Sequence, residues 1–254
     1  MENLLYKMPK YASIVLKKCL GLKSNEKFLI VTDSRLGNVA RIFYNEAKKI
    51  TKNVNLIKIP IPKVNGTEPS KDAGKEMLGY DAELLITTKS LSHTNARMNA
   101  SNKGARIVTM PGITEDILER IIDMDYDKLM LVHKKLGDII DNGKRVKIET
   151  EIGTNLSFSI EGRNAFGRDS GLFTRKGAFG NLPAGEIFVA PVEGTANGIY
   201  VVDASFAGIG KLRRPLEVNV KDGHVISFKG EKARKLENLL DSVGKEARNI
   251  AEFG

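Results

Sequence analysis

The chain has 254 residues, of which 41% are hydrophobic, so it can bury one large core or two ordinary ones. Its single cysteine, Cys19, excludes a disulfide framework within the chain and a cysteine-rich zinc module, and this favours a cytoplasmic protein. The 40 basic and 31 acidic residues leave a net charge of +9, but the basic residues form scattered pairs with few aromatic residues to stack on bases. We therefore expect no nucleic-acid partner. We also expect no membrane partner, since the amino terminus lacks a long apolar run.

The first part of the chain alternates strand-like apolar runs with helical patterns, which is typical of a parallel sheet wrapped by helices. Apolar residues from Leu36 to Ile50 recur at helical spacing, so a helix is predicted between the first two strands. The predicted strands are residues 27–33, 54–60, 83–89 and 105–111. This pattern predicts an open, mainly parallel, Rossmann-like α/β domain over residues 1–142.

A further helix is predicted to close this domain. Asp125 is placed to cap it, and Asn142-Gly143 carries the glycine signal of a helix end. His133 lies beside lysines in this helix and is interpreted as a surface residue. The apolar residues that share one face, and are expected to pack together, are Leu129, Val132, Leu136 and Ile140.

From Gly143 onward the apolar residues alternate with polar ones, which indicates antiparallel sheet. The pair Asp222-Gly223 is a strong hairpin signal. The predicted strands are residues 146–151, 156–160, 186–190, 198–203, 216–220 and 225–229. Apolar residues from Leu236 to Ile250 then predict a C-terminal helix that delivers Glu252. The predicted fold class is thus α/β, with a smaller β-rich domain over residues 143–254 that carries a C-terminal helix.

Common nucleotide and zinc-protease motifs are missing. The first predicted strand runs into Thr32-Asp33-Ser34-Arg35 instead of a glycine-rich loop, and no P-loop sequence occurs. The three histidines, His93, His133 and His224, are too far apart for an H-E-x-x-H helix. His93 follows a central strand, where clefts form in α/β sheets, and it is interpreted as a hydrogen-bonded residue at a helix start.

Glu186 is the most informative carboxylate. It follows Pro183 and Gly185 and opens an apolar run, where a buried charge needs a partner. Three interpretations are open: an exposed strand end, an ion pair with a nearby arginine such as Arg168 or Arg175, or a metal ligand.

Three segments resemble the metal-dependent aminopeptidases called aminopeptidase T and aminopeptidase S: residues 90–120, residues 180–210 with the motif LPAGE, and residues 248–254 with the motif AEFG. The resemblance implies a homodimeric hydrolase in which two divalent metal ions, zinc or cobalt, cleave the amino-terminal bond of a peptide substrate. Glu186 matches the glutamate of LPxGE and Glu252 that of AEFG, and both are metal ligands in the family. The resemblance assigns no general base and no substrate-binding residue here.

The other ligands of that family follow the AEFG glycine, and this sequence has no match to them. A two-metal hydrolase needs a full ligand set, so we expect the chain to be truncated and inactive by itself. Asp169, Glu193 and Asp203 are possible substitutes, with no reason to choose among them. The alternatives are a non-catalytic binding or assembly module derived from that fold and, third, a basic nucleic-acid binder.

Overall fold

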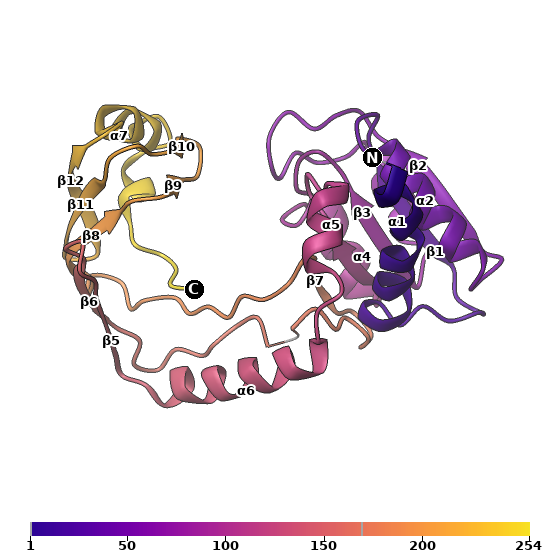
Figure 1. The fold of residues 1–254 in the computed structure, drawn as a ribbon, viewed down its shortest axis with the longest axis horizontal. Helices are drawn as coiled ribbons and strands as arrows, with labels where there is room; N and C mark the ends of the chain where they lie inside the picture. Colours follow the sequence, from indigo (N-terminus) through magenta and orange to yellow (C-terminus); the bar gives the residue numbers. More distant parts are fainter. Residues whose placement is uncertain (1, 169) are drawn as a thin grey trace. The chain divides into compact units, whose positions relative to one another are not determined.

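The computed structural model describes residues 2–168 and 170–254 (Figure 1). The chain forms two compact units: unit 1 comprises Met1–Met130 and Asp169–Gly185, and unit 2 comprises Leu131–Arg168 and Glu186–Gly254. Unit 1 contains a parallel sheet and unit 2 an antiparallel one, so the predicted α/β fold class is confirmed. Domain boundaries were expected at residue 142, whereas the compact units divide at Met130 and the segment 169–185 returns to unit 1.

The sheet of unit 1 has five parallel strands in the order β2-β1-β3-β4-β7. All four strands predicted for this part of the chain are present. The inner strands β1, β3 and β4 are buried at every residue, which explains their continuous apolar sequences. The bounds are β1 (Phe28–Thr32), β2 (Val54–Lys58), β3 (Ala82–Ile86), β4 (Arg106–Thr109) and β7 (Phe179–Asn181).

Helices cover both faces of this sheet. One core contains residues of α1, α2 and α5 together with Phe28 and Leu84, and a second core on the opposite face contains residues of α3 and α4 with Leu29 and Leu85. Neighbouring residues of a strand therefore serve different cores. The bounds are α1 (Glu2–Ile14), which continues into a π-helix (Val15–Cys19), α2 (Gly37–Lys48), α3 (Lys71–Met77), α4 (Asn95–Lys103) and α5 (Glu115–Ile121).

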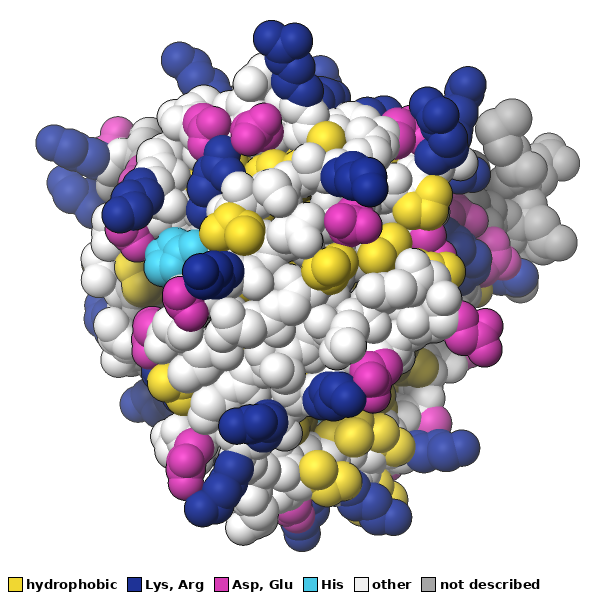
Figure 2. All heavy atoms as spheres, turned by 90° about the vertical axis from the view of Figure 1, so that its left-hand side faces the viewer, with side chains coloured by type: hydrophobic (Ala, Val, Ile, Leu, Met, Phe, Trp, Pro, Cys, Tyr) yellow, Lys and Arg dark blue, Asp and Glu magenta, His cyan; other side chains and the backbone are white. Residues whose placement is uncertain are grey.

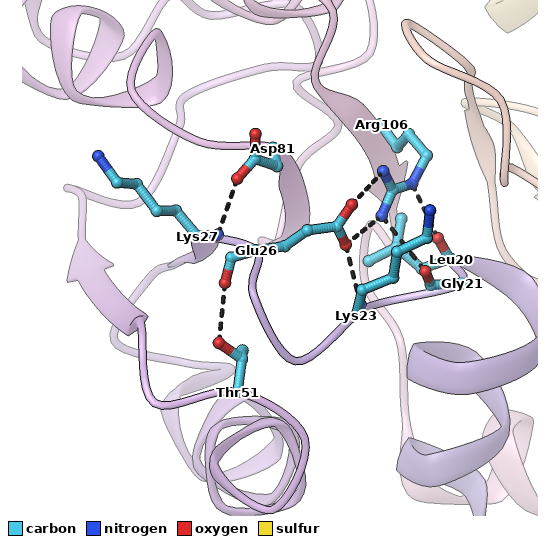
Figure 3. A network of polar contacts seen from close by, with 8 residues as sticks. All are labelled: Leu20, Gly21, Lys23, Glu26, Lys27, Thr51, Asp81 and Arg106. Carbon is cyan, nitrogen blue, oxygen red and sulfur yellow. Dashed lines mark hydrogen bonds and ion pairs between the residues drawn. The ribbon is translucent and has the colours of Figure 1, made fainter.

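A buried ion pair fixes the start of β4 to the loop before β1 (Figure 3). The guanidinium of Arg106 donates to both carboxylate oxygens of Glu26, at 2.9 and 2.7 Å, and its Nε donates to the carbonyl of Leu20 at 3.0 Å. The backbone N–H of Lys23 also donates to Glu26. Burial alone would raise the pKa of Glu26, but these hydrogen bonds and the charge of Arg106 together lower it below its ordinary value.

Helix α6 (Tyr126–Asn142) begins and ends where the sequence predicted. Asp125 caps it by accepting a hydrogen bond from the backbone N–H of Lys128. The expected apolar face is covered only in part: Leu129 and Ile140 are half-buried, and Ile140 packs against the core of unit 2, whereas Val132 and Leu136 are 44% and 42% exposed. Among the described helices, α6 included, none is long and apolar enough to cross a membrane.

The sheet of unit 2 has five antiparallel strands in the order β12-β11-β8-β6-β5. The hairpin predicted at Asp222-Gly223 is confirmed, and both residues have the positive φ angles, 48° and 80°, that a tight hairpin turn requires. The bounds are β5 (Arg145–Glu149), β6 (Asn155–Ser159), β8 (Asn197–Val202), β11 (Leu216–Lys221) and β12 (His224–Gly230), with a small pair β9 (Ser205–Phe206) and β10 (Gly210–Lys211).

The C-terminal helix is shorter than predicted. Helix α7 (Ala233–Asp241) ends before Gly244, whose φ of 124° breaks the helical pattern, and a 3-10 turn (Lys245–Arg248) follows. From Asn249 the chain is extended, and the N–H of Ile250 donates to the carbonyl of Gly223. The prediction that the helix itself carries Glu252 is therefore wrong: an extended tail carries it.

On the face shown in Figure 2, basic side chains lie among acidic and apolar ones.

Candidate metal-ligand site

Three extended segments of unit 2 lie side by side, and we call them the C-terminal ribbon: residues 166–168, 186–190 and 252–254. Phe166 and Phe188 exchange two backbone hydrogen bonds of 2.8 and 3.2 Å, and their rings stack with centroids 5.6 Å apart. Val189 and Phe253 exchange two more, of 2.9 and 3.0 Å. The strand predicted at 186–190 is thus reduced to two isolated bridges, because each neighbouring segment pairs with only one residue of 186–190.

The ribbon places Glu186 and Glu252 on an exposed surface. Val189 is fully buried, and Phe253 packs edge-on against Phe158 with ring centroids 5.5 Å apart. Since alternate residues of paired extended segments point to opposite faces, Glu252 points away from this core, and it is exposed. Glu186 is also exposed, and its Oε1 would lie 2.7 Å from a Cβ added at Gly254. The structure therefore brings together the two segments that carry the predicted ligands.

Gly167 supports the segment of Glu186. Its φ is 84°, and a Cβ there would overlap the carbonyl oxygen of Glu186, so this position requires glycine. The carbonyl of Gly167 lies 2.9 Å from Nδ1 of His133, which is only 2% exposed. Because a carbonyl oxygen only accepts, Nδ1 carries a proton and donates it to Gly167.

The prediction that His133 is a surface residue is wrong. The face of α6 that turns toward residues 165–168 contains His133 and Gly137, and the guanidinium of Arg168 lies over Gly137. The missing side chain at Gly137, one turn after His133, is the sequence signal that could have identified this packed face.

Arg168 forms its ion pairs with α6 and not with Glu186. Its guanidinium donates to Asp138 at 3.2 Å and to Asp141 at 2.5 Å, and Asp141 also accepts from the N–H of Ala165. Within residues 2–168 and 170–254, Glu186 forms no ion pair with Arg168 or Arg175, and Arg168 pairs with Asp138 and Asp141 instead.

The substitutes considered from the sequence do not complete a metal site. Glu193 pairs with Arg163, Asp203 is exposed, and Asp169 lies outside the described residues. In the part of the chain that the structure describes, no group of three or more His, Cys, Asp or Glu side chains is arranged to hold a metal ion. A catalytic zinc usually takes three protein ligands. The described residues thus do not supply a complete ligand set.

The other two histidines lie outside the C-terminal ribbon. His93, in unit 1, is exposed and precedes Thr94, whose side chain caps α4. His224, partly buried, has Nδ1 3.0 Å from the carbonyl of Asp222. Neither belongs to the C-terminal ribbon.

A buried carboxylate occupies the switch point of the parallel sheet, where strand order reverses between β1 and β3 and ligands commonly bind. Asp33 accepts hydrogen bonds from the N–H groups of Arg35 and Leu36 and, at 2.5 and 3.0 Å, from the N–H and hydroxyl of Thr88. These bonds join the carboxyl ends of the two strands, so the function of Asp33 here is structural.

Comparison with known proteins identifies the family. The sequence profile of the NicX family, described as 2,5-dihydroxypyridine 5,6-dioxygenase, matches residues 8–254. The chain belongs to this family. No curated protein matches the chain.

Two solved structures share the fold. The chain is similar to 2,5-dihydroxypyridine dioxygenase from Pseudomonas putida KT2440, with a TM-score of 0.80, 14% identity, and coverage of 97% of this chain and 75% of that chain. It is also similar to wild-type AmpT from Thermus thermophilus, with a TM-score of 0.67, 14% identity, and coverage of 97% and 77%.

These findings support the functional expectation only in part. The fold is related to that of aminopeptidase T, as the resemblance implied. The family whose profile matches the chain is, however, described as a dioxygenase. The reason is that a shared fold, and segments such as those around Glu186 and Glu252, can serve more than one chemistry.

Proposed function

We propose that this protein is a metal-dependent dioxygenase that opens the ring of 2,5-dihydroxypyridine or a closely related hydroxylated aromatic compound. The observation that carries the proposal is the family match over residues 8–254. The greater structural likeness to the dioxygenase, with a TM-score of 0.80 against 0.67 for AmpT, supports the same choice.

The proposed metal ligands of this chain are Glu186 and Glu252. Dioxygen chemistry requires a cofactor such as non-haem iron, which carboxylate ligands suit. Bound iron would supply the activation of dioxygen, and the C-terminal ribbon would hold the two carboxylates at one exposed edge. Because the described residues provide no third donor in place, the proposal requires further ligands from outside them. Asp169 is one candidate, and a second copy in the homodimer that the resemblance implies is another.

Oxygen uptake tests the proposal. In contrast to the inactive chain expected from the sequence, this proposal predicts that the protein with added Fe²⁺ consumes dioxygen when 2,5-dihydroxypyridine is supplied, with loss of the ring absorbance. Glu186→Gln should lower the rate at least about tenfold. Glu193→Gln is the matched control, since Glu193 pairs with Arg163 away from the ribbon. Equal rates in wild type and Glu186→Gln would contradict the role of Glu186.

The second candidate is an aminopeptidase, favoured by the LPAGE and AEFG motifs and by the likeness to AmpT. The metal separates the two candidates, because zinc has no redox chemistry and cannot activate dioxygen. Hydrolysis of a leucyl peptide with Zn²⁺ or Co²⁺, without oxygen uptake on the pyridine, would support the aminopeptidase. Inactivity in both assays together with no metal binding would favour the binding module.

A further inference from the structure

A groove follows the free edge of the parallel sheet in unit 1. Two cavities of about 500 and 410 Å³ adjoin each other and share Asn55 and Glu76 in their walls. One wall consists of residues from 53–60, which include β2, and the other of residues from 70–80, which include α3. The groove therefore follows β2 along its whole length.

Strand β2 offers backbone hydrogen-bonding groups along this edge. It ends the strand order, and within residues 2–168 and 170–254 no strand pairs with its outer side. Asn53 accepts from Phe28, and Ile59 donates to Thr32, so the odd-numbered residues face β1. By alternation, the even-numbered residues Val54, Leu56 and Lys58 direct their N–H and C=O groups outward.

One of these outward groups already has a partner. The N–H of Leu56 donates to the side chain of Asn55 at 2.9 Å. The N–H groups at both ends of β2 and the outward carbonyls are the groups that an added strand would use.

The charge of the groove is positive. Four exposed lysines line it, and none forms an ion pair with any described residue: Lys27, Lys52, Lys58 and Lys75. The acidic residues are Asp72 and Glu76, and an oxygen of Glu76 already accepts from the hydroxyl of Tyr80 at 2.5 Å. Lysines on and beside an edge strand, here Lys58 of β2 and its three neighbours, oppose pairing with a second copy of the same edge, whereas they attract a segment that carries carboxylates.

We propose that the β2–α3 groove binds an extended acidic peptide segment of another protein, which adds a strand to the free edge of the sheet. Backbone hydrogen bonds to Val54 and Lys58 supply the directional contacts, and the lysines select for acidic side chains. Every residue of the groove lies in unit 1, whereas the C-terminal ribbon of the proposed dioxygenase site belongs to unit 2.

The probe is a short capped peptide in which glutamate alternates with valine, titrated into the whole chain at low salt. We expect saturable binding with amide shifts in β2 and the first turns of α3. N-methylation of the peptide residues whose N–H groups face β2 should abolish binding, while N-methylation of the alternate residues should leave it intact, because only one set bonds to the edge.

Charge variants test the selection. Lys52→Glu and Lys75→Glu should each weaken binding by about two- to fivefold or more, in line with exposed ion pairs, and added salt should weaken it too. Lys135→Glu on α6 is the matched control and should have no effect. Failure of the peptide to bind, equal binding of a peptide with lysine in place of glutamate, or equal effects of both N-methylation patterns would overturn the proposal. The proposal would also be overturned if raising the protein concentration without peptide shifted the same amide resonances of β2 and α3, because this would assign the edge to a second copy of the chain.

Discussion

Glu83 should destabilise the fold in a pH-dependent way. It lies in the middle of the parallel sheet, with Leu29 of β1 and Ile107 of β4 as its register partners. The residue is 0% exposed, and neither carboxyl oxygen has a hydrogen-bond partner in the structure. Burial raises the pKa of Glu83 well above its ordinary value, so the folded protein keeps this carboxyl protonated at pH values where the unfolded chain ionises it.

The magnitude has two parts. An unsatisfied buried polar group costs about 1–3 kcal/mol, so Glu83→Met should raise the free energy of unfolding by about that amount at acid pH. The second part follows from the sign of the pKa shift. Because the folded pKa is raised, the contribution of the protonated carboxyl is complete below the unfolded pKa of about 4.3 and is lost as the pH rises. The loss is about 1.4 kcal/mol per pH unit until the folded pKa is reached.

Denaturant unfolding of wild type, Glu83→Met and Glu83→Gln between about pH 4 and 8 measures both parts. The advantage of Glu83→Met should grow with pH. Glu83→Gln keeps an unsatisfied polar group without the titration, so it should match wild type near pH 4 and become the more stable protein as the pH rises. Glu151→Gln, at an exposed turn, is the control and should change little. A pH-independent difference between wild type and Glu83→Met would refute the reasoning.

The remaining predictions concern the ion pair and the ribbon. Glu26→Gln should lower the free energy of unfolding by about 3–5 kcal/mol at neutral pH, because it leaves Arg106 buried without a charge partner. Since the pKa of Glu26 is lowered, the difference in stability between variant and wild type should shrink as the pH falls below about 4, and a difference that stays constant in denaturant melts would be inconsistent with this. His133→Leu should cost about 1–2 kcal/mol, while His133→Asn, whose amide can still donate to Gly167, should recover part of it in thermal unfolding; equal losses would exclude the hydrogen bond as the cause. Gly167→Ala should destabilise by about 1–3 kcal/mol and shift the amide resonances around Glu186, and unchanged resonances would show that the close approach is unimportant.

The parallel sheet was predictable because its inner strands are buried on both faces and so leave continuous apolar runs in the sequence. Strand β7 was not predictable. Its residues Phe179 to Asn181 show no strand pattern, and it forms only because the segment 169–185 returns to pair with β4. Such pairing depends on contacts between distant segments, which local periodicity does not record.

Helical periodicity also had limits. Apolar spacing from Leu236 to Ile250 fits a single helix, but Gly244 ends it early, and the last apolar residues pack from an extended tail instead. In α6 the spacing placed Val132, Leu136 and Ile140 on one packed face, whereas Val132 and Leu136 are exposed and the packed face combines Ile140 with His133 and Gly137. A helical pattern identifies the helix, but only the tertiary structure shows which face is covered.

The candidate site was only partly predictable. The resemblance implied that the segments of Glu186 and Glu252 lie close together. The pairing of Val189 with Phe253 confirms that these two segments meet. Their function as metal ligands stays a prediction. The support from His133 and Gly167 could not be foreseen, because the hydrogen bond joins residues from separate parts of the chain.

Paramagnetic broadening by Mn²⁺ tests the ligand pair most directly, because it detects weak binding as well as strong. We predict that low Mn²⁺ concentrations broaden the amide resonances of residues 185–187 and 251–254 before those of other carboxylates. Glu186→Gln and Glu252→Gln should each remove this selectivity in both segments, since the proposal has the two side chains bind the same ion. Broadening spread evenly over the exposed acidic residues, or selective broadening that survives in either variant, would contradict the assignment of Glu186 and Glu252 as a metal-binding pair.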